Sequence, residues 1–212
     1  MAKITLGGIT SAKKTIDQSD YPGDEKLTVD SIVGNTSLTI NNATNSDDVL
    51  DLTQTRLIPI GGKSTLTLGE NAHVKISEFF DVSIGQTSQY NLGEGSTLEY
   101  APASIGAGVA NSTTFDMGSD GTSTLIYNPG GVQLDFSSAP KIAGLSAGDQ
   151  IQVNGATQGA VEGNNLVFRD DHGRVVGSFN ASGQDLSKVT FEGGTMTYAC
   201  YLKGTHIATP EG

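Results

Sequence analysis

The chain has 212 residues, enough for one or two domains, and a net charge of -11 with only 12 Lys and Arg residues. Nucleic acids and anionic membranes bind clustered Lys and Arg, so we expect neither as a partner, and no apolar run is long enough for membrane insertion. The 28 glycines, the absence of Trp and the many Thr, Ser and Asn residues favour short strands joined by tight turns.

The first residues, MAKITLGGITSAKKTID, lack the apolar core of a standard signal peptide. The single cysteine, Cys200, leaves no intramolecular disulfide to support the fold. A single cysteine is compatible with a cytoplasmic protein, and equally with a secreted bacterial protein that avoids cysteine.

A repeat of 24 residues organises the centre of the chain. STLTLGENAHVKI (64–76) aligns with SQYNLGEGSTLEY (88–100), so that Leu66 matches Tyr90 and Ile76 matches Tyr100. The stretch 37–52 has the same form with a longer turn, and 123–136 repeats the form after an insertion. Each unit is predicted to be a strand, a turn and a second strand.

Apolar residues alternate along the predicted strands, which indicates one buried and one solvated face. A third apolar stretch, at 55–60 or 79–84, lies between units. Three short strands in about 24 residues are the dimensions of one coil of a parallel β-solenoid, in which stacked coils bury a column that one coil cannot bury. The alternative is a β-sandwich, which gives no reason for the fixed period.

We therefore predict an all-β protein with a β-solenoid at 1–140 and a β-rich cap or module at 141–199. Hairpins are expected in this second part, and RDDHGRV (169–175) is predicted as a turn between two strands. A solenoid needs such a cap because an open end exposes unpaired backbone groups.

The last residues, CYLKGTHIATPEG (200–212), resemble the beginning of a Hint domain, the fold of inteins and hedgehog autoprocessing domains. The segment before them, from about 132, resembles the segment that precedes Hint domains in large bacterial secreted or surface proteins. The resemblance implies that Cys200 is the nucleophile and that the bond after Ala199 is cleaved. It also implies a third part, 200–212, as the truncated start of that domain.

In the family, a later Thr-x-x-His element supplies the base and the oxyanion partner that such a nucleophile needs. We expect no self-cleavage by these residues, because that element would follow Gly212 and His206 does not replace it. The alternative is that Cys200 is an inert strand residue.

Other candidate sites have simpler structural interpretations. Asp47, Asp48, Asp116 and Asp120 are calcium candidates, as are Asp51, Asp170 and Asp171, but solvated turns are favoured because no known calcium loop is matched. The histidines, His73, His172 and His206, do not have zinc spacing. We expect no cofactor.

The predicted outward positions carry mainly uncharged polar and some charged residues: Thr39, Thr67, Lys75, Asn91 and Glu99. This pattern favours a non-catalytic structural or adhesive protein, secreted or at the bacterial cell surface, that self-associates, forms filaments or binds extracellular matrix or polysaccharide. The alternative is a carbohydrate-binding or carbohydrate-active β-helix, with Asp116 and Asp120 facing a groove.

Overall fold

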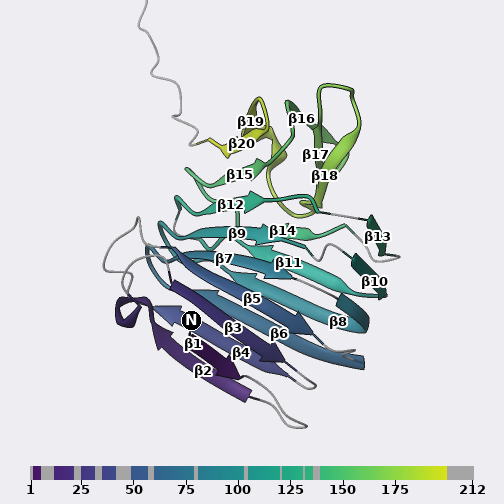
Figure 1. The fold of residues 1–212 in the computed structure, drawn as a ribbon. Coiled ribbons are helices and arrows are strands. Elements are labelled where there is room, and N and C mark those ends of the chain that lie inside the picture. Colours follow the sequence, from purple (N-terminus) through teal and green to yellow (C-terminus); the bar gives the residue numbers. More distant parts are fainter. Residues whose placement is uncertain are drawn as a thin grey trace, which may run out of the picture.

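The computed structural model describes residues 2–5, 12–21, 25–31, 35–41, 49–56, 60–78, 81–102, 105–119, 121–130, 132–135 and 139–199. Within these ranges the chain is built almost wholly from β-strands and contains no α-helix (Figure 1). Two short 3-10 turns, Gln18–Asp20 and Leu186–Lys188, complete the regular structure of this part.

The strands form two sheets that run along the length of the molecule. Sheet 1 has the order β1 (Ala2–Thr5), β3 (Glu25–Ser31), β5 (Leu50–Arg56), β7 (His73–Glu78), β9 (Thr97–Ala101), β12 (Thr124–Tyr127), β15 (Gln150–Val153), β20 (Thr195–Tyr198), β19 (Val189–Glu192). Sheet 2 has the order β16 (Gln158–Glu162), β17 (Asn165–Arg169), β18 (Val175–Asn180), β14 (Lys141–Ala143), β11 (Ser112–Asp116), β8 (Asp81–Asn91), β6 (Ile60–Leu68), β4 (Thr36–Asn41), β2 (Ala12–Asp17).

From β1 to β9, successive strands of the chain alternate between the two sheets, and neighbours within each sheet are parallel from the N-terminal end to β14 and β15. This is the predicted parallel β-solenoid, and it excludes the β-sandwich alternative, whose sheets are antiparallel.

The registers confirm the 24-residue repeat. Leu66 pairs with Tyr90 in sheet 2, and Ile76 pairs with Tyr100 in sheet 1. Leu52 pairs with Ile76, as the period also predicts. Outside the central coils the step changes, because the turns differ in length: Thr39 pairs with Thr67, 28 residues later.

The sequence pattern of the unit at 123–136 suggests that its first strand stacks on the first strand of the 88–100 unit, but the structure differs. Its first strand, β12, pairs with β9, which is the second strand of the 88–100 unit. The next strand, β13 (Val132–Asp135), then pairs with β10 (Ile105–Val109) on a third side of the coil. The alternation of apolar and polar residues does not show which strand of a coil a segment forms, because each strand of a coil has the same alternation.

The third side of the coil is partly built from the predicted apolar stretches. β8 bends at Gly85, which has a φ of 67°. Its first part, Asp81–Ile84, pairs with β10, and its second part pairs with β11. A residue in the left-handed region turns the strand direction there, and glycine adopts that region without steric cost.

The core is a stack of inward columns between the two sheets. One column of sheet 2 contains Leu38, Leu66, Tyr90, Phe115 and Ile142, all of which are buried. Each such side chain contributes about 1.5–3 kcal/mol by leaving water. The neighbouring outward residues are only partly buried, so the alternation that predicted the strands is also the alternation of burial.

Glycine is required where consecutive coils approach closely at one corner. A Cβ on Gly93 would lie 2.8 Å from the carbonyl oxygen of Leu68 and 2.9 Å from the carbonyl carbon of Gly69. The Gly-Glu pairs that share this corner in the sequence, at 69–70 and 93–94, therefore reflect the stacking distance of the coils.

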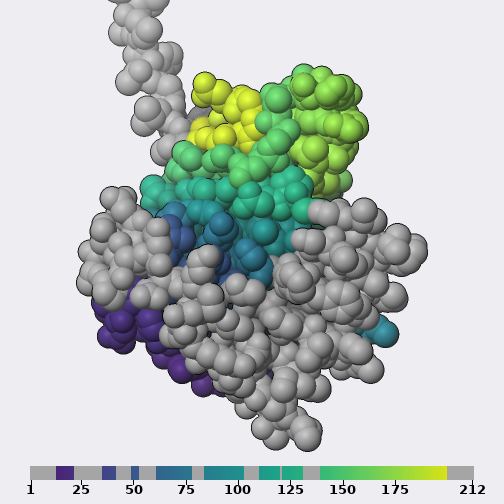
Figure 2. All heavy atoms as spheres, viewed as in Figure 1, coloured from purple at the N-terminus to yellow at the C-terminus, as the bar shows by residue number. Residues whose placement is uncertain are grey.

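After β15 the chain forms the cap, defined here as residues 154–199. β17 and β18 form an antiparallel hairpin around the predicted turn, and β19 and β20 form a second hairpin. The predicted hairpins are thus confirmed, although β14 and β15, beyond residue 140, still continue the parallel coils. In the space-filling view the cap lies directly on the last coils (Figure 2).

Aromatic rings join the cap to the solenoid core. The Phe115 and Phe179 ring centroids are 6.4 Å apart, and those of Tyr127 and Phe179 are 5.2 Å apart. Phe179 in turn contacts Phe168, which contacts Phe191. The core of the solenoid therefore continues without interruption into the cap.

Candidate functional site

Ala199, the residue before the predicted scissile bond, directly follows β20, which lies between β15 and β19. The Ala199 backbone N–H donates to the Lys188 carbonyl oxygen at 2.8 Å, and that of Tyr198 donates to the Asp149 carbonyl oxygen at 2.9 Å. The residue before the predicted cleavage point is thus fixed to the cap by a backbone hydrogen bond, and Tyr198 is fixed to the last coil. Cys200 and His206 lie outside the described residues, so the predicted nucleophile has no structural description.

Of the seven calcium candidates, four lie within the described part of the chain: Asp51, Asp116, Asp170 and Asp171; the other three, Asp47, Asp48 and Asp120, lie outside it. Asp116 ends β11, next to Asn91 on one side and Ala143 on the other. Its Oδ1 accepts a hydrogen bond from the Gly118 backbone N–H at 3.3 Å, so it takes part in the turn that follows β11.

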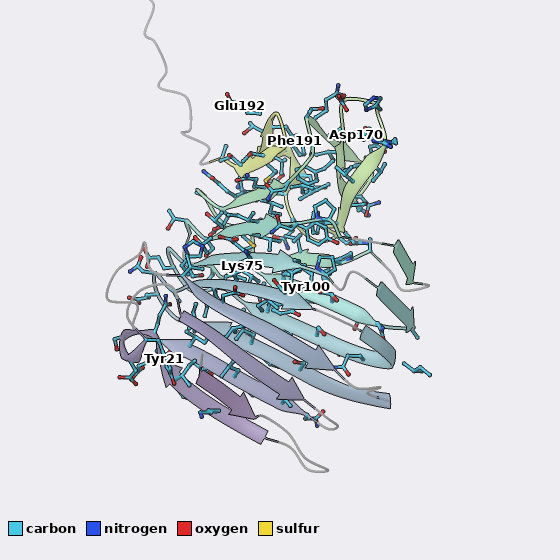
Figure 3. All side chains as sticks on the ribbon, viewed as in Figure 1. Tyr21, Lys75, Tyr100, Asp170, Phe191 and Glu192 are labelled. Atoms are coloured by element: carbon cyan, nitrogen blue, oxygen red, sulfur yellow. The ribbon has the colours of Figure 1, made fainter. Side chains whose placement is uncertain are left out.

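One group of three possible metal ligands meets among the described residues: Asp170, Asp171 and His172, whose ligand atoms lie within 4.8 Å of one another. The group is on the β17–β18 hairpin, away from the Lys75 and Tyr100 side chains on the coils (Figure 3).

The turn itself uses both oxygens of Asp170. Oδ1 accepts from the backbone N–H groups of His172 at 3.0 Å and Arg174 at 2.9 Å, and Oδ2 accepts from the Arg174 Nε at 2.7 Å. Burial disfavours the charged form of Asp170, but the hydrogen bonds from Arg174 and His172 outweigh it and lower the pKa of this carboxyl group. These contacts explain the acidic cluster as a hairpin turn.

The two described histidines are on separate elements. His73 begins β7, and its Nε2 lies 3.0 Å from Glu99 Oε1 on the neighbouring strand. His172 is in the hairpin turn, with its Nδ1 2.6 Å from Asp171 Oδ1. Each histidine therefore has a carboxylate neighbour of its own.

Two outward columns, one on each sheet, differ in charge. On sheet 1, Asp51, Lys75 and Glu99 follow one another in register, so opposite charges alternate from coil to coil. On sheet 2, the corresponding column contains Thr39, Thr67 and Asn91, and the Asn91 Nδ2 donates to Thr67 Oγ1 at 3.2 Å. The outward residues named from the sequence thus form ladders between coils, one charged and one uncharged.

Sequence reasoning missed Asp149, the most completely buried carboxylate that the structure describes, with an exposed fraction of 0%. Its Oδ1 accepts from the Ser123 N–H at 2.9 Å, and its Oδ2 accepts from the Ser146 N–H at 2.7 Å and from Ser146 Oγ at 3.1 Å. Burial raises the pKa of Asp149, although these hydrogen bonds partly oppose the shift. The available signal was Ser146 placed three residues before Asp149 in a Gly-Asp turn.

Comparisons of the chain with protein-family models, with curated proteins and with solved structures gave no match. Within the described ranges, no helix has the length and apolar character needed to cross a membrane.

Proposed function

We propose that this chain is a non-catalytic structural or adhesive β-solenoid that acts through its surfaces and through self-association. The observation that supports this most directly is the ladder arrangement of the outward side chains. Asn91 bonds to Thr67 and His73 lies against Glu99, so polar groups of one coil are used to hold the next. Such a surface is long, regular and rigid, as a scaffold or adhesive requires.

The proposed setting is the bacterial cell surface or extracellular matrix, with the solenoid as the passenger of a Hint domain that begins at Cys200. The resemblance of residues 200–212 supports this, together with the position of Ala199 at the end of a hydrogen-bonded strand. In that arrangement the cap holds the residue before the cleaved bond, and the following domain supplies the chemistry.

The test combines sedimentation with an assay for turnover. We expect the sedimentation coefficient of the purified chain to rise with concentration, and we expect no new reducing ends from a panel of polysaccharides. Release of reducing ends would contradict the non-catalytic role. Sedimentation as a monomer at all concentrations would remove self-association and leave adhesion to another molecule.

The second candidate is a carbohydrate-binding protein, and the run of uncharged polar residues in one outward column of sheet 2 favours it. Hydroxyl and amide groups at Thr39, Thr67 and Asn91 repeat at the strand spacing of about 4.8 Å, which suits hydrogen bonding to a neutral polymer.

This candidate predicts that the chain co-sediments with an insoluble neutral glucan. It also predicts that Thr67→Lys weakens binding, whereas Ser77→Lys on the outward face of sheet 1 is the matched control and leaves it unchanged. Equal binding by the two variants and the parent would argue against sheet 2 as the binding face.

A further inference from the structure

The two ends of the solenoid differ in how their sheets finish. At the cap end, the terminal strands β16 and β19 contact each other, and the Phe191 ring lies where a Cβ on Gly159 would be. At the other end, β1 and β2 each pair with one strand in the part of the chain that the structure describes. Figure 1 shows β2 as the last strand of the stack on that side. Among the described residues, each end therefore finishes in two strands that pair on one side only, but the two at the cap end pack against each other.

We propose that β2 pairs antiparallel with β2 of a second copy, around a two-fold axis at Thr15, to give a head-to-head dimer. The sequence of β2, AKKTID, is self-complementary in this register. Lys13 of each copy lies opposite Asp17 of the other, and Thr15 lies opposite itself. Opposite charges and Thr–Thr pairs directly across an antiparallel ladder are favourable.

The faces of the strand agree with this register. Lys13, Thr15 and Asp17 align with Ser37, Thr39 and Asn41 of β4, which face outward, so the charged residues would meet on the solvated side of the dimer. Lys13 is exposed in one copy and is available to a second one.

Lys14 belongs to a column of sheet 2 whose other named residues are buried in the core. It aligns with Leu38, which is buried, yet Lys14 itself is exposed at the end of the stack. An inward-facing lysine on an edge strand discourages unspecific pairing with other strands. In the proposed register Lys14 lies opposite Ile16 of the second copy, where its aliphatic stem covers apolar surface while its ammonium group reaches water.

This arrangement rests on the proposed role in self-association and makes it specific. Molecules that join through β2 alone form an isologous contact, and such a contact closes as a dimer. Growth into filaments by end-to-end stacking would need a second contact, at the cap end.

Charge exchange between Lys13 and Asp17 tests the register, with dimerisation measured by native mass spectrometry and sedimentation equilibrium. Lys13→Asp and Asp17→Lys each place like charges opposite each other twice per dimer, so each should weaken dimerisation about tenfold or more. The double variant should restore it, and an equimolar mixture of the two single variants should form the heterodimer.

Cross-linking tests the two-fold axis in a Cys200→Ser background. Thr15→Cys should give a disulfide-linked dimer under mild oxidation, because directly opposite Cα atoms of an antiparallel pair are about 4.5–5.5 Å apart, a separation that a disulfide spans. Thr39→Cys, in the same outward column but on an interior strand, is the control and should stay monomeric on a non-reducing gel.

Three results would overturn the proposal. The first is a parent chain that stays monomeric at every concentration, which would also remove self-association from the proposed function. The second is a double variant that dimerises no better than the single ones. The third is the formation of filaments, which would keep self-association but place a second contact at the cap end.

Discussion

Asp149 connects two consecutive coils, since its Oδ1 accepts a hydrogen bond from the Ser123 backbone N–H at 2.9 Å, 26 residues earlier in the chain. Its other oxygen holds the Ser146 N–H. We predict that Asp149→Ala lowers the free energy of unfolding by about 3 kcal/mol, because it leaves buried N–H groups without an acceptor. Urea denaturation measures this. Asp185→Ala, which removes an exposed turn acceptor, is the control and should have a much smaller effect.

The raised pKa of Asp149 predicts a pH dependence with a definite sign. The native state binds a proton at higher pH than the unfolded state, whose carboxyl group has its usual pKa of 3.8. The stability of the parent relative to Asp149→Asn should therefore increase as the pH falls through the raised pKa towards 3.8, and decrease as the pH rises through the same window. Denaturation of both proteins across this range measures the difference. A constant difference, or one of the opposite sign, would contradict the assignment.

Phe179 makes the cap part of the solenoid core through its contacts with Phe115 and Tyr127. We predict that Phe179→Ala lowers the free energy of unfolding by about 4 kcal/mol, the cost of a large buried cavity. We also expect the parent to unfold in one calorimetric transition. Val175→Ala, at a side chain that is 55% exposed, should change stability by less than about 0.5 kcal/mol. Two separate transitions in the parent would show that the cap and the coils have independent cores.

Gly93 tests the close stacking of the coils. Gly93→Ala should cost about 3 kcal/mol, because the new Cβ collides with the backbone at Leu68 and Gly69. Gly163→Ala provides the comparison: that residue has a φ of 61° but open space around its Cβ, so its cost of about 1 kcal/mol comes from the backbone conformation alone. Thermal unfolding of both variants should rank Gly93→Ala as the less stable. The reverse order would mean that the coils are not in contact at this corner.

The repeat in the sequence predicted the central registers because its period is unbroken there. Leu66 with Tyr90 and Ile76 with Tyr100 follow from one offset. The repeat did not predict that β12 pairs with β9 or that parallel pairing continues into β14. Turns of other lengths interrupt the period there, and each strand has the same alternation of apolar and polar residues.

The candidate site was less predictable than the fold. The hairpin around Asp170 followed from its turn residues, but the use of both its oxygens within the turn depends on the exact path of the chain. Asp149 looks like a solvated turn residue in the sequence. Its burial depends on Ser123, which packing against the preceding coil brings beside it.

The bond between Ala199 and Cys200 should remain intact in the purified chain. A thioester formed at this position would be cleaved by an added thiol or by hydroxylamine, but the base and oxyanion partner expected from the Hint resemblance are not among the 212 residues. Intact-mass spectrometry after incubation with each reagent should give the mass of the full chain. A fragment that ends at Ala199 would show that the described residues or the segment 200–212 activate Cys200 by themselves.

Negative-stain electron microscopy across a concentration series tests the central claim, that this solenoid is a structural protein that assembles through its N-terminal end. We predict discrete particles that double in length as concentration rises, with a cap at each outer end. Single-length particles at every concentration would contradict the claim.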